Sequence, residues 1–69
     1  MRVAILGAGG HGKVVADAAM AMPGTTVVGF LDDDAALAGQ TFMGLSVLGV
    51  VPLWQDIAID AIVPAIGNN

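Results

Sequence analysis

The chain has no cysteine and a single histidine, so its possible chemistry is restricted before any pattern is considered. Without cysteine there can be no disulfide, no zinc–thiolate site and no thiol nucleophile. One histidine alone supplies neither a nucleophile–base pair nor a cluster of metal ligands. We therefore expect neither a catalytic centre nor a metal site among these residues.

Charged residues are also scarce, at 12% of the chain, whereas hydrophobic residues make up 57%. The two cations, Arg2 and Lys13, stand against six aspartates, and the net charge is −4. Nucleic-acid-binding domains normally have a basic surface, so this balance argues against nucleic acid as a partner. It also implies that a bound phosphate would be held mainly by backbone N–H groups.

The sequence lacks an apolar run long enough for a membrane span, which needs about 20 largely uninterrupted apolar residues. The apolar run of residues 3–6 is likewise too short for the core of a signal peptide. These absences predict a cytoplasmic protein. A domain of 69 residues with so little polar surface is expected to be covered in part by another domain or subunit.

The hydrophobic periodicity predicts strands at residues 2–6, 25–31 and 60–66, each rich in apolar or β-branched residues. We expect the strands at residues 2–6 and 60–66 to be buried, although Pro64 favours the edge of a sheet. A helical period covers residues 10–22. One face of this helix is expected to hold the apolar side chains Val14, Val15, Ala18, Ala19 and Met22.

The region between the second and third strands is less regular. Residues 35–39 are expected to form a loop or a single helical turn, and residues 41–48 an irregular extended segment or a short hairpin. Pro52 is suited to open a short helix that ends near Ile57. The order predicts an α/β fold, a small Rossmann-like βαβ(α)β unit with a parallel sheet. Because such sheets need cover on both faces, we expect a fragment of a longer chain.

The loop after the first strand reads GAGGHGK and fits the G-x-G-x-x-G pattern of dinucleotide-binding loops. In that setting Gly7 permits a tight turn, Gly9 lets a phosphate approach the backbone, and Gly12 allows the helix to pack closely on the strand. The helix N-terminus would then offer free N–H groups to an anion. The same pattern is compatible with a glycine-rich turn that binds nothing.

Aspartates follow the second strand, at positions 32–34. Asp32 lies 20 residues after Gly12, where the dinucleotide fold has an acid that accepts hydrogen bonds from a ribose hydroxyl. The alternative for this cluster is a solvated loop and helix cap, which best explains Asp34.

His11 lies within the predicted phosphate loop, where its imidazole could donate to a ligand oxygen or act as an acid or base. A structural role for His11 is equally compatible with the sequence. Lys13 is explained well enough as a surface charge.

Taken together, GAGGHGKVVADAA, VVGFLDDD and the terminal AIGNN resemble one family over essentially the whole chain. It is the N-terminal domain of the bacterial sialic-acid O-acetyltransferases and bacillosamine-pathway N-acetyltransferases. The resemblance implies a Rossmann-like domain, residues 1–69, that binds a UDP-linked amino sugar. A C-terminal left-handed β-helix of hexapeptide repeats, absent from this chain, would form a homotrimer, bind acetyl-CoA and supply the catalytic histidine.

The resemblance also assigns substrate-binding residues. The family's contacts to the nucleotide sugar correspond here to Gly9, Gly10, His11, Asp32, Asp33, Gly67 and Asn68. The loop would cradle the diphosphate or sugar, and the aspartates would hold the uridine or its ribose. The chain itself would bind no cofactor, since acetyl-CoA is the co-substrate of the full-length enzyme.

Two other functions stay open. An N-terminal βαβ unit of an NAD(P)-dependent oxidoreductase explains the glycines and Asp32, but it does not require His11, the three aspartates or the terminal GNN. A non-catalytic nucleotide-binding module would fit if the natural chain ended near Asn69. Whether this chain alone has enzymatic activity is left open by the sequence.

Overall fold

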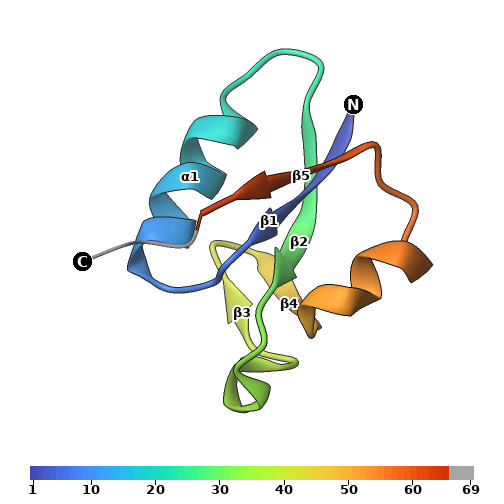
Figure 1. The fold of residues 1–69 in the computed structure, drawn as a ribbon. Helices are drawn as coiled ribbons and strands as arrows, with labels where there is room; N and C mark the ends of the chain where they lie inside the picture. Colours follow the sequence, from blue (N-terminus) through green and yellow to red (C-terminus); the bar gives the residue numbers. More distant parts are fainter. Residues whose placement is uncertain (66–69) are drawn as a thin grey trace.

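The computed structural model describes residues 1–65, which form a five-stranded sheet with one α-helix and two short 3-10 helices (Figure 1). In chain order the elements are β1 (Arg2–Leu6), α1 (Gly10–Met20), β2 (Thr26–Leu31), η1 (Ala35–Leu37), β3 (Thr41–Phe42), β4 (Leu45–Gly49), η2 (Val51–Asp56) and β5 (Ala61–Pro64). The predicted strands and helices are all present, and residues 41–48 form a short hairpin. None of the helices described is long and apolar enough to cross a membrane.

The strand order is β3-β4-β2-β1-β5, with β1 parallel to both β2 and β5, and β2 parallel to β4. Only the β3–β4 pair is antiparallel in the described sheet. The chain therefore adds strands on one side of β1 and then returns to its other side, which confirms the Rossmann-like unit. In sheets of this kind, ligands bind at the carboxyl ends of the strands where the order reverses, here between β1 and β5.

The third predicted strand differs from the expectation in its burial. Among the described residues β5 is an edge strand, its first three residues are only half-buried, and Pro64 is exposed at its end. The prediction of a buried strand was wrong, whereas the preference of Pro64 for a sheet edge is confirmed. A proline there leaves no ladder donor missing from the sheet interior.

The helix α1 packs through its smallest residues, and this differs from the expected apolar face. Gly12, Ala16 and Ala19 are the buried residues of α1. By contrast, Val14 is 66% exposed and Met22, beyond the helix end, is 60% exposed. A Cβ on Gly12 would overlap the carbonyl oxygen of Gly7. Because the helix lies this close to the end of β1, no side chain fits at Gly12, and the buried positions of α1 are glycine and alanine, with Val15 half-buried beside them.

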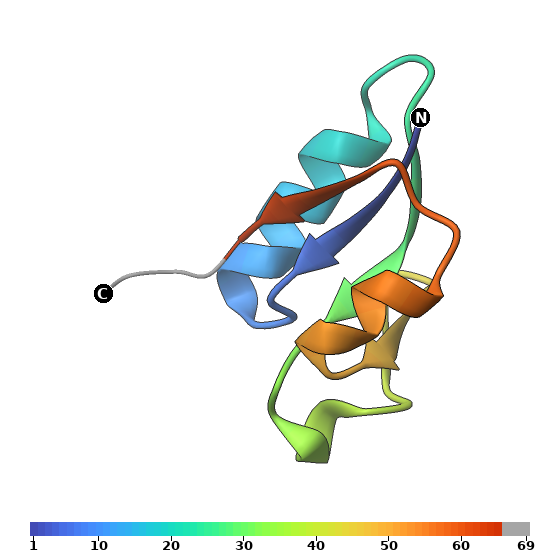
Figure 2. The same ribbon diagram turned by 45° about the vertical axis from the view of Figure 1, so that its right-hand side comes forward.

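The core lies between α1 and the sheet and includes Val3, Ile5, Val27 and Phe30. The β1–β2 register shifts between Val3 and Ala4, which pair with Val27 and Gly29. This shift explains why residues 27 and 30 both face the helix, since regular alternation would place them on opposite faces. Figures 1 and 2 show η2 on the other side of the sheet from α1.

The contact between α1 and β1 gives a testable expectation for stability. Gly12→Ala should destabilise the chain by about 1–3 kcal/mol or more, because the added methyl has no space. Gly10→Ala is the matched control, since a Cβ there meets nothing within 4 Å, and its effect should stay within about 0.5 kcal/mol. Urea unfolding followed by circular dichroism measures both. Equal stability of the two variants would contradict the close packing described here.

Candidate functional site

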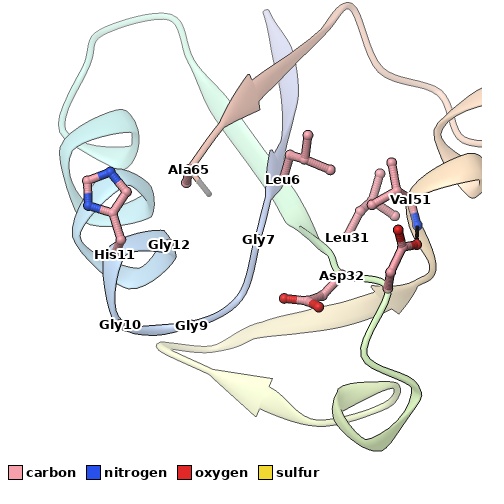
Figure 3. Close-up of a pocket in the computed structure, with 11 residues that line it drawn as sticks. Leu6, Gly7, Gly9, Gly10, His11, Gly12, Leu31, Asp32, Val51 and Ala65 are labelled. Atoms are coloured by element: carbon pink, nitrogen blue, oxygen red, sulfur yellow. Dashed lines mark hydrogen bonds between the residues drawn. The ribbon is translucent and has the colours of Figure 1, made fainter. Parts of the chain in front are cut away.

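An open cleft of about 550 Å³ lies at the carboxyl ends of β1, β2 and β5 (Figure 3). Three strand ends and the first turn of α1 supply most of its wall. The lining residues are Leu6, Gly7, Gly9, Gly10, His11, Gly12, Leu31, Asp32, Asp33, Val51 and Ala65. The cleft therefore brings together five of the seven residues to which the resemblance assigned substrate binding: Gly9, Gly10, His11, Asp32 and Asp33. Gly67 and Asn68 lie outside the described residues.

The glycine loop between β1 and α1 has the conformation that its sequence predicts. Gly7 has φ 108°, a value that side chains other than that of glycine rarely allow, and its N–H donates to the carbonyl of Leu31 at 2.7 Å. Gly9 is the N-cap of α1, and neither Gly9 nor Gly10 would place a Cβ within 4 Å of another atom. The turn and the close helix packing are thus confirmed, and space is open beside Gly9.

The N-terminus of α1 carries backbone donors that the fold itself does not use. The first-turn N–H groups of Gly10, His11 and Gly12 have no partner within a helix. No side chain caps this end, the first turn holds no acid, and no acceptor for these groups is found among residues 1–65. Together with the helix dipole, these donors favour an anion at this end of the cleft.

The three aspartates after β2 each accept a hydrogen bond from a backbone N–H. The two carboxylate oxygens of Asp32 accept from Ala8 and from Asp34, each at 2.9 Å. Asp33 accepts from the N–H of Val51 at 2.9 Å, at the start of η2. Asp34 accepts from Ala36 at 3.0 Å and caps η1, which confirms the cap expected for it. The acids thus connect the β2 end to three other segments.

His11 is the second residue of α1, and its side chain is exposed. Figure 3 shows its ring on the side of the cleft nearer Ala65 and directed away from Asp32. The cleft therefore has Asp32 and Asp33 at one end and His11 at the other. An elongated ligand with an anionic part and a hydroxyl-bearing part could contact both ends and the glycine loop between them.

Neither cation of the described residues lines the cleft. The Nζ of Lys13 lies 4.2 Å from the ring centroid of Phe42, and Phe42 in turn contacts Phe30 edge to face. Lys13 thus makes a cation–π contact, where the sequence indicated only surface charge. Arg2, at the amino end of β1, donates from Nε to the carbonyl of Ala58 at 2.8 Å. An anion in the cleft would accordingly meet backbone N–H groups and His11.

Sequence reasoning did not identify Leu6, Leu31, Val51 or Ala65 as lining residues. Three of them end a strand or directly follow one, and Val51 begins η2 directly after Val50, which follows β4. The rule that parallel strands present their carboxyl ends to one site would have identified Leu6, Leu31 and Ala65, once the strand order was known.

A family model described as the PglD N-terminal domain matches residues 2–69 of the chain. Comparisons with curated proteins and with solved structures gave no match.

The free donors at the α1 N-terminus predict that the cleft binds a polyanion. Pyrophosphate at ten times its Kd should stabilise the chain by about 1.4 kcal/mol, because it binds only the folded state. For a domain of this size that corresponds to a rise in Tm of roughly 5–10 °C. Thermal unfolding measures it, with sodium chloride of equal ionic strength as the salt control.

The matched variant for this measurement is Gly9→Leu, whose side chain would project into the open space beside the loop. Its φ of −75° suits any residue, so the fold should persist. We expect this variant to lose the pyrophosphate response. An equal rise in Tm in both proteins would show that the anion binds elsewhere.

Proposed function

The chain belongs to the PglD N-terminal domain family, the N-terminal domains of nucleotide-sugar acetyltransferases, and we propose that its cleft binds a UDP-linked amino sugar. The observation that carries this proposal is the cleft at the strand-order reversal, with an uncapped helix N-terminus on one wall and carboxylates at one end. Such a site has donors for a diphosphate and acceptors for hydroxyl groups.

The proposed ligand lies across the glycine loop. Its diphosphate accepts hydrogen bonds from the N–H groups around Gly9 and Gly10, where no side chain intervenes. His11 contacts the ligand from the far end of the cleft. Asp32 and Asp33 line the end of the cleft where the uridine or its ribose is proposed to bind. Hydroxyl and imide groups donate hydrogen bonds, and a carboxylate at this end can accept one. Gly67 and Asn68 complete the proposed contact set.

Acetyl transfer itself is proposed to take place outside this chain. In the full-length protein a C-terminal β-helix of hexapeptide repeats would bind acetyl-CoA, form the trimer and provide the general base. The role of the present domain is then to hold the sugar nucleotide so that its amino group reaches that centre. Fixing the substrate in this way lowers the entropic cost of the reaction.

The rival ligand is a nicotinamide dinucleotide. Asp32 at the end of β2 occupies the place of the ribose-binding acid in dinucleotide folds, so the position of this residue alone does not separate the two. The favoured reading depends on His11 and on the run of three aspartates, which a dinucleotide site does not need.

Titration calorimetry separates these functions. We expect UDP and UDP-linked amino sugars to bind the chain, and NAD and acetyl-CoA to give no heat of binding beyond dilution. The expectation for acetyl-CoA follows from placing its site on the proposed C-terminal β-helix. Binding of NAD without any response to UDP would refute the nucleotide-sugar function and support the dinucleotide one.

A second experiment addresses His11. Replacing His11 with alanine should weaken UDP-sugar binding by about 2- to 12-fold, the usual contribution of one hydrogen bond. Stability should not change, because the side chain is exposed. Val14→Ala is the matched control, since Val14 is 66% exposed on the same helix and does not line the cleft. Identical UDP-sugar affinities of the two variants would show that His11 does not contact the ligand.

A further inference from the structure

We infer that Asp32 is a positioning residue: its carboxylate holds the glycine loop in the form that presents N–H groups to a phosphate, and it takes no ligand hydroxyl itself. The inference rests on the proposed nucleotide-sugar function and refines it. It departs from the role that an acid at the end of the second strand has in dinucleotide folds, which is to bind a ribose hydroxyl.

The backbone N–H groups of the glycine loop have acceptors within the fold up to Ala8 and, among the described residues, none directly after it. The N–H of Gly7 donates to the carbonyl of Leu31 at 2.7 Å, and the next N–H, that of Ala8, donates to Asp32 at 2.9 Å. Two consecutive donors are therefore bound to the end of β2. From Gly9 to Gly12 no acceptor for the backbone N–H groups is found within residues 1–65. Asp32 thus accepts the hydrogen bond from Ala8, the last N–H group of the loop that is bonded within the described fold. The N–H groups that follow Ala8 are available to a ligand.

Ala8 is the residue of the loop whose buried side chain and bonded N–H can hold the backbone in one conformation. It is the only non-glycine residue among residues 7–10, and its side chain is 2% exposed and belongs to the core. Glycines on both sides allow many backbone conformations, so the loop is not rigid by its own sequence. The buried methyl of Ala8 and the bond from its N–H to Asp32 together fix the path of the chain into α1.

The geometry of Asp32 also argues against a ligand contact. The residue is half-buried, and each of its oxygens already accepts a backbone N–H, one from Ala8 and one from Asp34. Asp33 is exposed on the same cleft, and within the described residues only its Oδ1 accepts a bond, from Val51. Its Oδ2 is the carboxylate oxygen of the cleft at which, within residues 1–65, no backbone N–H competes with a ligand hydroxyl.

The test compares UDP with uridine, which lacks the diphosphate, by NMR titration of the 69-residue chain. In Asp32→Asn the carboxamide oxygen can accept only one of the two backbone bonds, since the amide nitrogen is a donor. We expect the UDP affinity to fall about tenfold while the uridine affinity stays within about twofold. An equal loss for both ligands would show that Asp32 contacts the nucleoside, and no loss for either would show that it does not position the loop.

Asp34→Asn is the matched control. It removes the same charge from the same loop, Asn remains a good cap for η1, and Asp34 does not line the cleft. Loss of a negative charge near a phosphate can only raise UDP affinity, so we expect no decrease. A decrease as large as that of Asp32→Asn would overturn the positioning role.

Hydrogen exchange in the ligand-free chain tests the loop independently of any ligand. The amide of Ala8 should exchange at least tenfold faster in Asp32→Asn than in the wild type or Asp34→Asn, because its acceptor is lost or misplaced. This result holds even if the wild type does not bind UDP, in which case the proposed function alone fails. Unchanged exchange would refute the bond on which the inference rests.

A wild-type measurement applies if Asp32→Asn does not fold. The Ala8 amide should keep its protection from exchange when uridine or UDP is bound. Faster exchange on adding uridine would mean that the carboxylate leaves Ala8 for the ligand, which contradicts the inference.

Discussion

The close contact between α1 and the end of β1 is the constraint on which the rest of this structure depends. Gly12 lies so near the carbonyl oxygen of Gly7 that no side chain fits between them. This contact fixes the rotation of the helix, so that Ala16 and Ala19 also face the sheet. It also places the helix N-terminus at the carboxyl edge of the sheet, beside the cleft. The contact between Gly12 and Gly7 thus determines both the packing of the core and the position of the site.

The chain uses its few charged groups mainly to hold its own backbone. Each aspartate of the cluster at positions 32–34 accepts at least one backbone N–H, and Arg2 donates to a backbone carbonyl. Lys13 rests on the ring of Phe42. With both cations placed outside the cleft, backbone donors are left for an anion. Such donors are fixed by the fold and need no side-chain ordering when a ligand binds, which reduces the entropic cost of binding.

Local patterns were sufficient for much of this fold and part of the site. The strands and helices follow from short apolar runs and their glycine and proline boundaries, and the roles of Gly7 and Gly12 follow from the loop pattern. The helix face followed only in part: Val15 and Ala19 pack on the core as expected, whereas Val14 and Met22 are exposed and Ala16 is buried. Hydropathy ranks Val14 and Met22 above Ala16, but the close approach of the helix at Gly12 decides which side faces the sheet. The sequence likewise did not predict the contacts of Asp33 with Val51 and of Lys13 with Phe42. Each joins segments whose approach depends on the strand order.

The sequence by itself determined the element order, the phosphate-loop pattern and the family, because these depend on residue types at short, fixed spacings. Only the tertiary structure decided which side of the helix is buried and which strand lies at the edge. It also decided that Asp32, which was expected to hold the uridine or its ribose, accepts a hydrogen bond from the N–H of Ala8 in the glycine loop. The physical reason is that these outcomes depend on distances between segments remote in sequence. Such distances are set by packing and hydrogen bonding across the sheet, which no local spacing records.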